Sequence, residues 1–125
     1  MGGKLLFIGF AGAGGALARY ALAGLVQKVS GGVFPWGTFV VNIAGCFAFG
    51  LIWAITEKRL AFAAESRVYL LTGFLGAFTT FSTFAFETGA MMRDGEYLLA
   101  TANLGIHNIL GICALFIGLA LGTLI

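Results

Sequence analysis

The residues best suited to chemistry lie in one stretch of the chain, 73–88, which reads GFLGAFTTFSTFAFET. Thr80, Thr83 and Glu87 follow one another in it at spacings of three and four residues. On a helix these spacings bring side chains onto one face, so the stretch carries a stripe of two hydroxyls and a carboxylate. An ionisable side chain inside a membrane helix costs about 2.5–3.5 kcal/mol, so Glu87 is a candidate functional residue that should face protein or water.

An aromatic pair, Phe81 and Phe84, lies beside this polar stripe at a spacing of three residues. Ordinary packing is one interpretation of such a pair. The other interpretation follows from the electronic structure of the ring, whose edge carries partial positive charge. Edge-on rings next to hydroxyl groups can contact an anion without holding it by a fixed charge.

The same stretch contains residues that weaken a helix. Gly73 and Gly76 precede the paired Thr79 and Thr80. Gly is the poorest helix former after Pro, and hydroxyl side chains compete for backbone hydrogen bonds. We therefore expect a helix break between Gly76 and Thr80. At membrane depth a break must line a cavity or be buried in protein, and its freed carbonyl groups are good ligands for hard cations.

Two further pairs of polar residues lie four positions apart and so share a helix face: Thr38 with Asn42, and Asn103 with His107. For Asn42 two interpretations stand side by side. Its amide either forms a helix–helix hydrogen bond, worth about 0.6–2 kcal/mol, or donates into a pore. His107 is either a hydrogen-bonded packing residue, a proton relay or a pore-lining group.

A positive charge, Arg19, lies late in the first apolar segment of the chain. A long arginine side chain can reach the membrane interface while its stem stays in lipid. The alternative is that Arg19 anchors a contact between helices or subunits.

Composition indicates which elements must position these residues. The chain has 125 residues, 60% hydrophobic and 10% charged, and its mean hydropathy is +1.02. Soluble domains carry roughly 25% charged residues, so lipid is the expected solvent for much of this chain. A spanning helix needs roughly 20 residues. Four apolar segments of about that length predict a single all-α transmembrane domain over residues 1–125, with the third helix broken mid-membrane: about Leu5–Val26, Gly37–Ile55, Val68–Arg93 and Tyr97 to the C-terminus.

Several function classes are disfavoured by the same composition. The net charge is only +2 and no Lys/Arg cluster is present, so no nucleic-acid partner is expected. The chain has one His and no Ser/His/Asp set, so it is not expected to be an enzyme. Cys46 and Cys113 lie in apolar runs and are expected to be small buried hydrophobic residues.

The loop charges bear on orientation in the membrane. With four spans, one side holds four positive residues and the other holds two, or three if Arg19 reaches the interface: Lys4, Lys58, Arg59 and Arg67 against Lys28 and Arg93. A clear Lys/Arg excess orients a chain, and this excess is small. Insertion in both orientations, and hence an antiparallel homodimer, is therefore expected.

Small residues are spaced to form helix contacts. Gly118 with Gly122, and Gly12 with Ala16, make small-xxx-small pairs of the kind that lets membrane helices approach closely. The alternative is that Gly is merely frequent in membrane helices.

Three motifs resemble the Fluc (CrcB) family of fluoride channels, and the resemblance extends over nearly the whole chain. They are GGALARY at 14–20, PWGTFVVNIAG at 35–45 and TGFLGAFTTFSTFAFE at 72–87. The third motif is long and specific to this family. The resemblance implies an antiparallel, dual-topology homodimer with two separate fluoride pathways.

The resemblance also implies roles for particular residues. The Asn42 amide points into the pathway, the ring edges of Phe81 and Phe84 contact the anion, and a structural Na⁺ at the dimer centre is held by main-chain carbonyls of Gly76 and Thr79 from both chains. The arginine of the family's first helix falls on Arg19. The polar track beside the rings matches Thr38, Ser82, Thr83 and Glu87, and His107 is included in the predicted pathway.

The resulting prediction is a channel that passively exports fluoride across the cell (inner) membrane. One alternative is a proton-coupled exporter of the small multidrug type, which needs a central carboxylate, whereas Glu87 lies off-centre in the third segment. The other alternative is a membrane assembly subunit that transports nothing.

Overall fold

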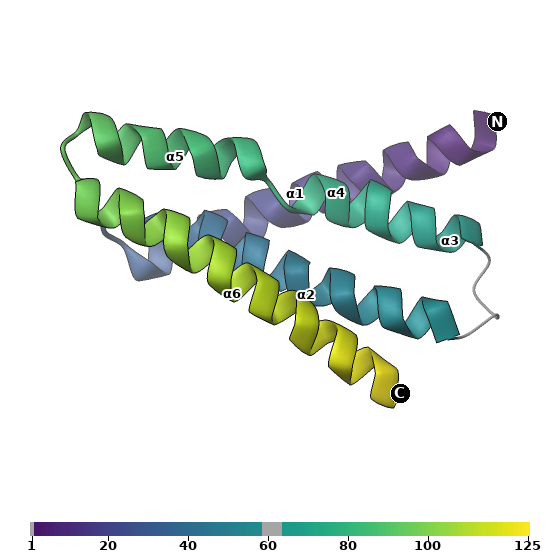
Figure 1. Ribbon diagram of the computed structural model, residues 1–125. Helices are drawn as coiled ribbons and strands as arrows, with labels where there is room; N and C mark the ends of the chain where they lie inside the picture. Colours follow the sequence, from purple (N-terminus) through teal and green to yellow (C-terminus); the bar gives the residue numbers. More distant parts are fainter. Residues whose placement is uncertain (1, 59–63) are drawn as a thin grey trace.

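The computed structural model describes residues 2–58 and 64–125, which are mainly helical and contain no strand. In chain order the helical segments are α1 (Gly2–Ser30), α2 (Trp36–Lys58), α3 (Ala64–Val68), the π-helical η1 (Tyr69–Leu75), α4 (Gly76–Phe78), α5 (Phe81–Arg93) and α6 (Tyr97–Leu124) (Figure 1). The all-α prediction is therefore confirmed over these residues.

Four stretches are long and apolar enough to cross a membrane: Gly2–Ser30, Trp36–Glu57, Glu65–Arg93 and Tyr97–Leu124. Their mean hydropathies are 1.5, 2.0, 1.4 and 2.1. The third stretch is composite, because α3, η1, α4 and α5 follow one another within it. The prediction of four transmembrane helices is confirmed in these terms, and the helices extend a few residues beyond the predicted apolar segments.

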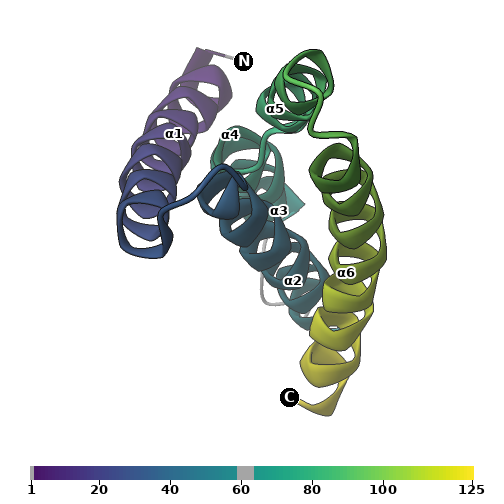
Figure 2. The same cartoon turned by 90° about the vertical axis from the view of Figure 1, so that its left-hand side faces the viewer.

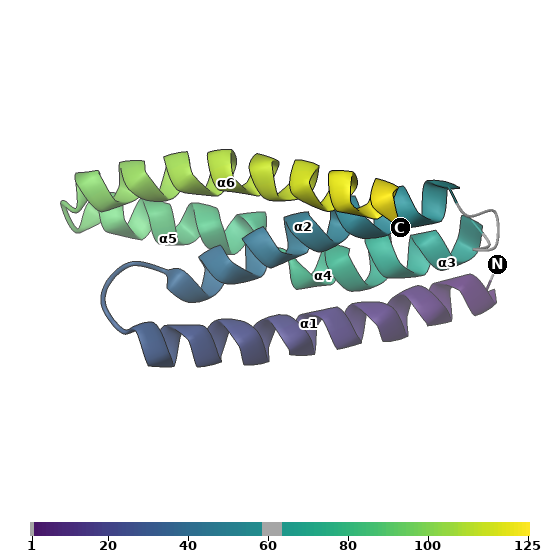
Figure 3. The same ribbon diagram turned by 90° about the horizontal axis from the view of Figure 1, so that it is seen from below.

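The helices run back and forth along one long axis. The N-terminus, the C-terminus and the start of α3 lie at one end, while the α1–α2 and α5–α6 connections lie at the other (Figures 1 and 3). α2 lies between α1 and α6 when the molecule is viewed along its axis (Figure 2), and its most extensive contact is with α6. The third span packs on α1 through η1 and α4, and on α6 through α5.

Glycines make the contact between α2 and α6 close. A Cβ added at Gly50 would overlap the carbonyl oxygen of Leu115, and one added at Gly118 would overlap that of Phe47. A Cβ at Gly122 would lie 2.7 Å from the Cβ of Ala54. Without side chains at these positions the two backbones can touch, which increases the dispersion contact between the helices. This contact matters in a membrane, because the hydrophobic effect does not drive helices together in lipid. The predicted Gly118–Gly122 contact face is thus confirmed.

The first span uses a different glycine from the predicted pair. A Cβ at Gly12 would lie 3.6 Å from the carbonyl oxygen of Gly73, an ordinary contact. At Gly15, by contrast, a Cβ would overlap the carbonyl oxygen of Phe74. Gly15 is therefore the residue that lets α1 approach the π-helical segment η1 closely.

The helix break in the third span is short. α4 ends at Phe78 and α5 begins at Phe81, and the two residues between them are extended: Thr79 has φ −81° and ψ 155°, and Thr80 has φ −148° and ψ 112°. Gly76, the first residue of the predicted break, is itself helical with φ −61° and ψ −32°. The interruption is therefore confined to the two threonines, whose extended backbone is supported by side chains as described below.

The packed core is small, and large apolar side chains cover the outside. The buried cluster consists of Val41, Leu71, Leu75 and Phe78. Exposed large hydrophobic residues occur along α1, α5 and α6, including Phe10, Tyr20, Phe81, Phe86, Leu98 and Phe116. Exposed apolar surface of this extent is typical of a protein that meets lipid or another subunit rather than water.

The connection between α1 and α2 is tied down by one side chain. Gln27 donates from Nε2 to the carbonyl oxygens of Gly32 and Phe34, and its Oε1 accepts the N–H of Gly37. Gly31 and Gly32 have φ of 63° and 76°, a backbone conformation that Gly adopts without steric cost. These contacts fix where α2 begins.

Charged side chains gather at the opposite end of the bundle. Lys4 pairs with Glu65, and the Arg67 guanidinium lies over the ring of Trp53, 4.9 Å from its centroid. Amphipathic groups of this kind are common where a span leaves the hydrocarbon. Arg59, which was counted among the positive loop residues, lies outside the described residues.

We expect Gly118→Ala to destabilise the protein by about 1–3 kcal/mol, because the new methyl group is forced against the α2 backbone. Gly105→Ala is the matched control on the same helix, since a Cβ there meets nothing within 4 Å. That control should be neutral or slightly stabilising, as Ala is the better helix former. Thermal unfolding of the detergent-solubilised protein measures both, and equal midpoints would contradict the close α2–α6 contact.

Candidate functional site

The break in the third span is held by Asn42 of α2. Its Oδ1 accepts the N–H of Thr80 at 2.8 Å, and its Nδ2 donates to the carbonyl oxygen of the same residue at 3.1 Å. The amide therefore satisfies both backbone groups of one extended residue, as a neighbouring strand would. This contact is the helix–helix hydrogen bond of the first interpretation. It uses one of the two Nδ2 hydrogens, so the other remains available to a ligand.

Hydroxyl groups complete the start of α5. Thr80 is the N-cap residue, and its Oγ1 accepts the N–H of Thr83 at 3.2 Å. The Thr80 hydroxyl also donates to Oγ1 of Thr83 at 2.9 Å, and Oγ of Ser82 lies 3.4 Å from it. The hydroxyl proton of Thr83 is not used in these contacts. The N-terminus of α5 thus presents hydroxyl groups together with the backbone N–H groups that a helix leaves unpaired.

The break also diverts donors from two carbonyl groups. In a continuous α-helix the N–H of Thr80 would reach the carbonyl of Gly76, and that of Thr83 would reach the carbonyl of Thr79. Here these two N–H groups donate to Asn42 and to the Thr80 hydroxyl instead. The carbonyls of Gly76 and Thr79, which were predicted as cation ligands, therefore lack the N–H partners that a continuous helix would give them.

A hydroxyl–carboxylate contact joins α2 to α5. The buried Thr38 donates from Oγ1 to Oε1 of Glu87 at 2.7 Å. Oε2 of Glu87 is buried and accepts no hydrogen bond from the described residues. Glu87 therefore faces protein, as predicted for an intramembrane carboxylate, and one of its oxygens is left for water or an ion.

Aromatic rings form a contiguous row beside these polar groups. Phe81 and Phe84 are in contact, with ring centroids 5.6 Å apart, as their spacing predicts. Phe84 also lies 4.4 Å from the ring of His107, which in turn meets Phe39 nearly edge to face at 5.3 Å. The two phenylalanines differ in environment: Phe84 is 6% exposed, whereas Phe81 is 79% exposed in the single chain.

A buried polar network between α5 and α6 was not predicted from the sequence. Thr88 donates to the carbonyl oxygen of Phe84 at 2.8 Å, and Nδ2 of Asn103 donates to the Thr88 hydroxyl at 2.8 Å. Asn103 is completely buried, and its main-chain carbonyl lies 3.1 Å from Nδ1 of His107. The spacing of Asn103 and His107 was a usable signal, but nothing in the sequence identifies Thr88 as their partner.

Unpaired polar atoms concentrate at this site. Among the described residues, four buried side-chain atoms have no hydrogen-bond partner: Nε of Arg19, Oε2 of Glu87, Oδ1 of Asn103 and Nε2 of His107. Folded proteins bury few such atoms, because each costs about 1–3 kcal/mol when left unpaired. All four belong to the polar residues singled out in the sequence, and two of these residues line the pockets described next: Arg19 the first and His107 the second.

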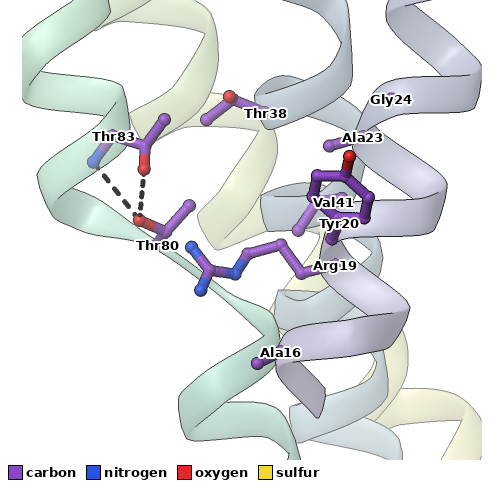
Figure 4. Close-up of a pocket in the computed structure, with 9 residues that line it drawn as sticks. All are labelled: Ala16, Arg19, Tyr20, Ala23, Gly24, Thr38, Val41, Thr80 and Thr83. Carbon is purple, nitrogen blue, oxygen red and sulfur yellow. Dashed lines mark hydrogen bonds between the residues drawn. The ribbon is translucent and has the colours of Figure 1, made fainter. Parts of the chain in front are cut away.

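Two pockets lie against the break, and Thr80 lines both. The first, of about 330 Å³, lies between α1 and the break and is lined in part by Arg19, Thr38 and Thr83. Figure 4 shows the Arg19 side chain extending from α1 toward Thr80. Arg19 thus brings positive charge next to the hydroxyl groups of the break. The sequence had suggested only that Arg19 reaches the membrane interface or anchors a contact between helices or subunits.

The second pocket, of about 470 Å³, is lined by four of the eight predicted fluoride-pathway residues and by both predicted cation ligands. Its lining includes Asn42, Gly76, Thr79, Phe81, Phe84, His107 and also Cys46, which was expected to be buried packing but is half-buried here. Cys113 is exposed rather than buried. Since Thr80 lies between the two pockets, a path joining them would pass the Asn42–Thr80 contact.

The described structure therefore gathers the predicted residues around one feature, the Thr79–Thr80 break. Asn42, Phe84 and His107 line the second pocket, whereas Thr38 and Thr83 line the first. Glu87 lines neither pocket but accepts the hydrogen bond of Thr38. Ser82 is exposed and also lines neither pocket, and its hydroxyl lies 3.4 Å from that of Thr80. No cluster of three or more His, Cys, Asp or Glu side chains occurs among the described residues, so a cation here would depend on main-chain oxygens.

Comparison with known proteins finds one family and similarly named relatives over nearly the whole chain. Residues 6–119 match the family described as CrcB-like protein, Camphor Resistance (CrcB). A protein of Solidesulfovibrio magneticus is 61% identical over 98% of both chains, one of Nitrosococcus oceani 56%, and one of Nitratidesulfovibrio vulgaris (strain Miyazaki F) 50%, each again over 98% of both chains. All three relatives are named fluoride-specific ion channel FluC.

We expect Asn42→Ala to destabilise the protein by about 1–3 kcal/mol for each Thr80 backbone group left unpaired. Asn108→Ala is the matched control, because Asn108 is exposed and donates only to the carbonyl oxygen of Leu104 one turn earlier. Thermal unfolding in detergent compares the two variants. Equal stability of the two would show that Asn42 does not hold the break.

Proposed function

The chain belongs to the CrcB family, and from this premise we propose that it is a fluoride-specific ion channel through which fluoride leaves the cell passively. The observation that carries the proposal is the likeness of the whole chain, at 61% identity, to a relative of that name. The four spans make it a multi-pass membrane protein, and the membrane we propose is the cell (inner) membrane. The geometry of the break supports the proposal through the chemistry that fluoride requires.

Fluoride is small and strongly hydrated, so a pathway must replace its water shell with hydrogen-bond donors. Donors that remain free at the break are the second Nδ2 hydrogen of Asn42 and the hydroxyl proton of Thr83. Neither carries a fixed positive charge, which would hold the anion too tightly to release it. Conduction needs binding that is favourable but weak, and neutral donors provide it.

The N-terminus of α5 adds to this environment. α5 begins at Phe81, directly after the break, and residues of its first turn line the two pockets: Thr83 the first, and Phe81 and Phe84 the second. The N-terminus of a helix carries the positive end of its dipole and is a common site for anions. This helix end supports an anion pathway beside Phe81 and Phe84.

Arg19 would act at the mouth of the first pocket. Its guanidinium points toward the break (Figure 4), yet the contacts of the break are formed by Asn42 and the threonines rather than by Arg19. A positive charge near the entrance of a pocket raises the local concentration of anions. Because the charge is not part of the binding site itself, it does not slow the release of the anion. Thr38 lines the same pocket, and its contact with Glu87 would form part of the polar track.

Export needs no energy-coupling domain. Hydrogen fluoride is a weak acid that crosses lipid uncharged and ionises inside the cell. A membrane potential that is negative inside then drives the anion outward, at about 2.3 kcal/mol per charge per 100 mV. A passive pore is therefore sufficient, and the protein need not act as an enzyme.

We propose that the working unit is an antiparallel homodimer with two pathways. Phe81 is 79% exposed in the single chain although it lines a pocket with other pathway residues, so a second copy would enclose it. Gly76, also at this pocket, is exposed too. The small positive-charge bias of the loops supports insertion in both orientations.

A structural Na⁺ at the dimer centre fits the same break. Gly76 and Thr79 line the second pocket, and the N–H groups that would pair with their carbonyls in a continuous helix donate elsewhere. Neutral main-chain oxygens without a carboxylate suit a monovalent ion better than a divalent one. Such an ion would supply positive charge that stabilises the break and joins the two chains.

Fluoride efflux from liposomes containing the purified protein tests the proposal against its alternatives. We expect fluoride to be released, with chloride largely retained. A small multidrug-type exporter would instead move an organic cation in exchange for protons, and an assembly subunit would leave the liposomes silent. Either of those results would refute the proposed function.

We expect Phe81→Ile and Phe84→Ile to abolish fluoride efflux while the dimer still forms, because Ile keeps much of the volume but has no ring edge. If the rings only pack, the changes should cost about 1–3 kcal/mol of stability and leave efflux largely intact. Size-exclusion chromatography checks assembly beside the efflux measurement. Phe86→Ile is the matched control, since Phe86 is an exposed phenylalanine of the same helix that lines neither pocket; its efflux should persist.

Dual topology predicts partial labelling of a cysteine placed in the α5–α6 turn. In Asp94→Cys, with Cys46 and Cys113 replaced by Ala, a membrane-impermeant thiol reagent should modify only part of the protein from outside the cell. Permeabilised membranes should then be labelled completely. Complete labelling before permeabilisation would exclude insertion in both orientations.

A further inference from the structure

His107 is the only histidine of the chain, and its position is unusual. Its ring lies between Phe39 of α2, at 5.3 Å and 85°, and Phe84 of α5, at 4.4 Å and 44°. It also lines the second pocket together with Asn42 and Phe81. A titratable ring is therefore packed directly against one of the two phenylalanines of the proposed pathway.

The hydrogen bonding of the ring defines which nitrogen carries the proton. Nδ1 lies 3.1 Å from the carbonyl oxygen of Asn103, and a carbonyl oxygen can only accept, so Nδ1 is the donor. In the neutral ring Nε2 then bears a lone pair. This Nε2 is buried and has no hydrogen-bond partner among the described residues. The neutral ring thus presents an unsatisfied acceptor at the site.

Building on the proposed function, we propose that His107 is a proton-controlled donor of the fluoride pathway. When Nε2 is unprotonated, its lone pair opposes a passing anion and offers no replacement for lost water. When Nε2 is protonated, the same atom becomes a charged N–H donor, which forms stronger hydrogen bonds than a neutral one. Fluoride passage should therefore increase as the pH falls through the titration of His107.

The groups around the ring determine whether the protonated form would trap the ion. On α5, Glu87 supplies a carboxylate that is joined to Thr38 of α2, the residue one position before Phe39. On α2, Cys46 lines the same pocket and is the other titratable group that faces it. α6 itself carries no Asp, Glu, Lys or Arg, and Arg19 lines the first pocket instead. The imidazolium loses its charge whenever Nε2 releases its proton, so it is not a fixed charge that would retain the anion.

Fluoride efflux from proteoliposomes, measured from about pH 8 to about pH 5.5 with the same pH on both sides, tests the proposal across the ordinary titration range of histidine. The wild-type rate should rise at least about fivefold, because only the protonated ring offers Nε2 as a donor. Protein-free liposomes give the rate at which hydrogen fluoride crosses lipid alone, which is subtracted.

Two variants assign the pH dependence to a residue. His107→Gln keeps a hydrogen-bonding side chain that does not titrate, and its efflux should be independent of pH. Cys46→Ala removes the other titratable group that lines the second pocket, and its efflux should still rise toward low pH. Wild-type efflux that does not change with pH, or a pH dependence that survives in His107→Gln, would overturn the role of His107 while leaving the channel function standing. Silence at every pH would instead refute the channel function and this inference with it.

A second readout does not depend on flux. With a single histidine, the ring-nitrogen NMR signals of ¹⁵N-histidine-labelled protein belong to His107 without further assignment. If fluoride prefers the protonated ring, reciprocity requires that fluoride shift the titration midpoint to higher pH. We expect sodium fluoride to raise the midpoint and sodium chloride at equal concentration not to do so. Identical midpoints in the two salts would contradict the proposal.

Discussion

The structure depends on one constraint, that backbone groups within a membrane must find partners inside the protein. The third span breaks this rule locally at Thr79 and Thr80, and α2 restores it with a single amide. Asn42 binds both the N–H and the carbonyl of Thr80, while the Thr80 hydroxyl caps α5. Two extended residues are stable here because a side chain of the neighbouring helix forms the hydrogen bonds that an adjacent β-strand would otherwise form.

The same break has two ends of opposite character. α4 stops at Phe78 and leaves carbonyl groups, whereas α5 starts at Phe81 and leaves N–H groups. A carbonyl end favours a cation and an N–H end favours an anion, as the helix dipole requires. A structural sodium ion and a fluoride pathway are therefore compatible proposals for one short segment, since each would use the polar groups that the other cannot.

The sequence was informative where physical rules act locally. Four apolar segments and the glycines of the break region were sufficient to predict four spans and an interruption near Thr80, and the three-residue spacing of Phe81 and Phe84 predicted that the rings touch. The π-helical segment η1 was not predicted, and neither was the close approach of Gly15 to the backbone of Phe74 within it, which depends on how α1 packs on the third span. The Thr88–Asn103 contact was likewise missed, since it depends on how α5 is rotated against α6.

The close contact between α2 and α6 has a consequence for biogenesis. These two helices form the most extensive packing of the molecule, yet they are separated in the chain by the whole third span. The ribosome completes α2 long before α6, so the second span must wait in the bilayer, with Gly50 uncovered, until the last span is inserted. Assembly of this fold therefore depends on the insertion of α6, and synthesis interrupted before α6 leaves a chain that exposes its best contact face to other membrane proteins.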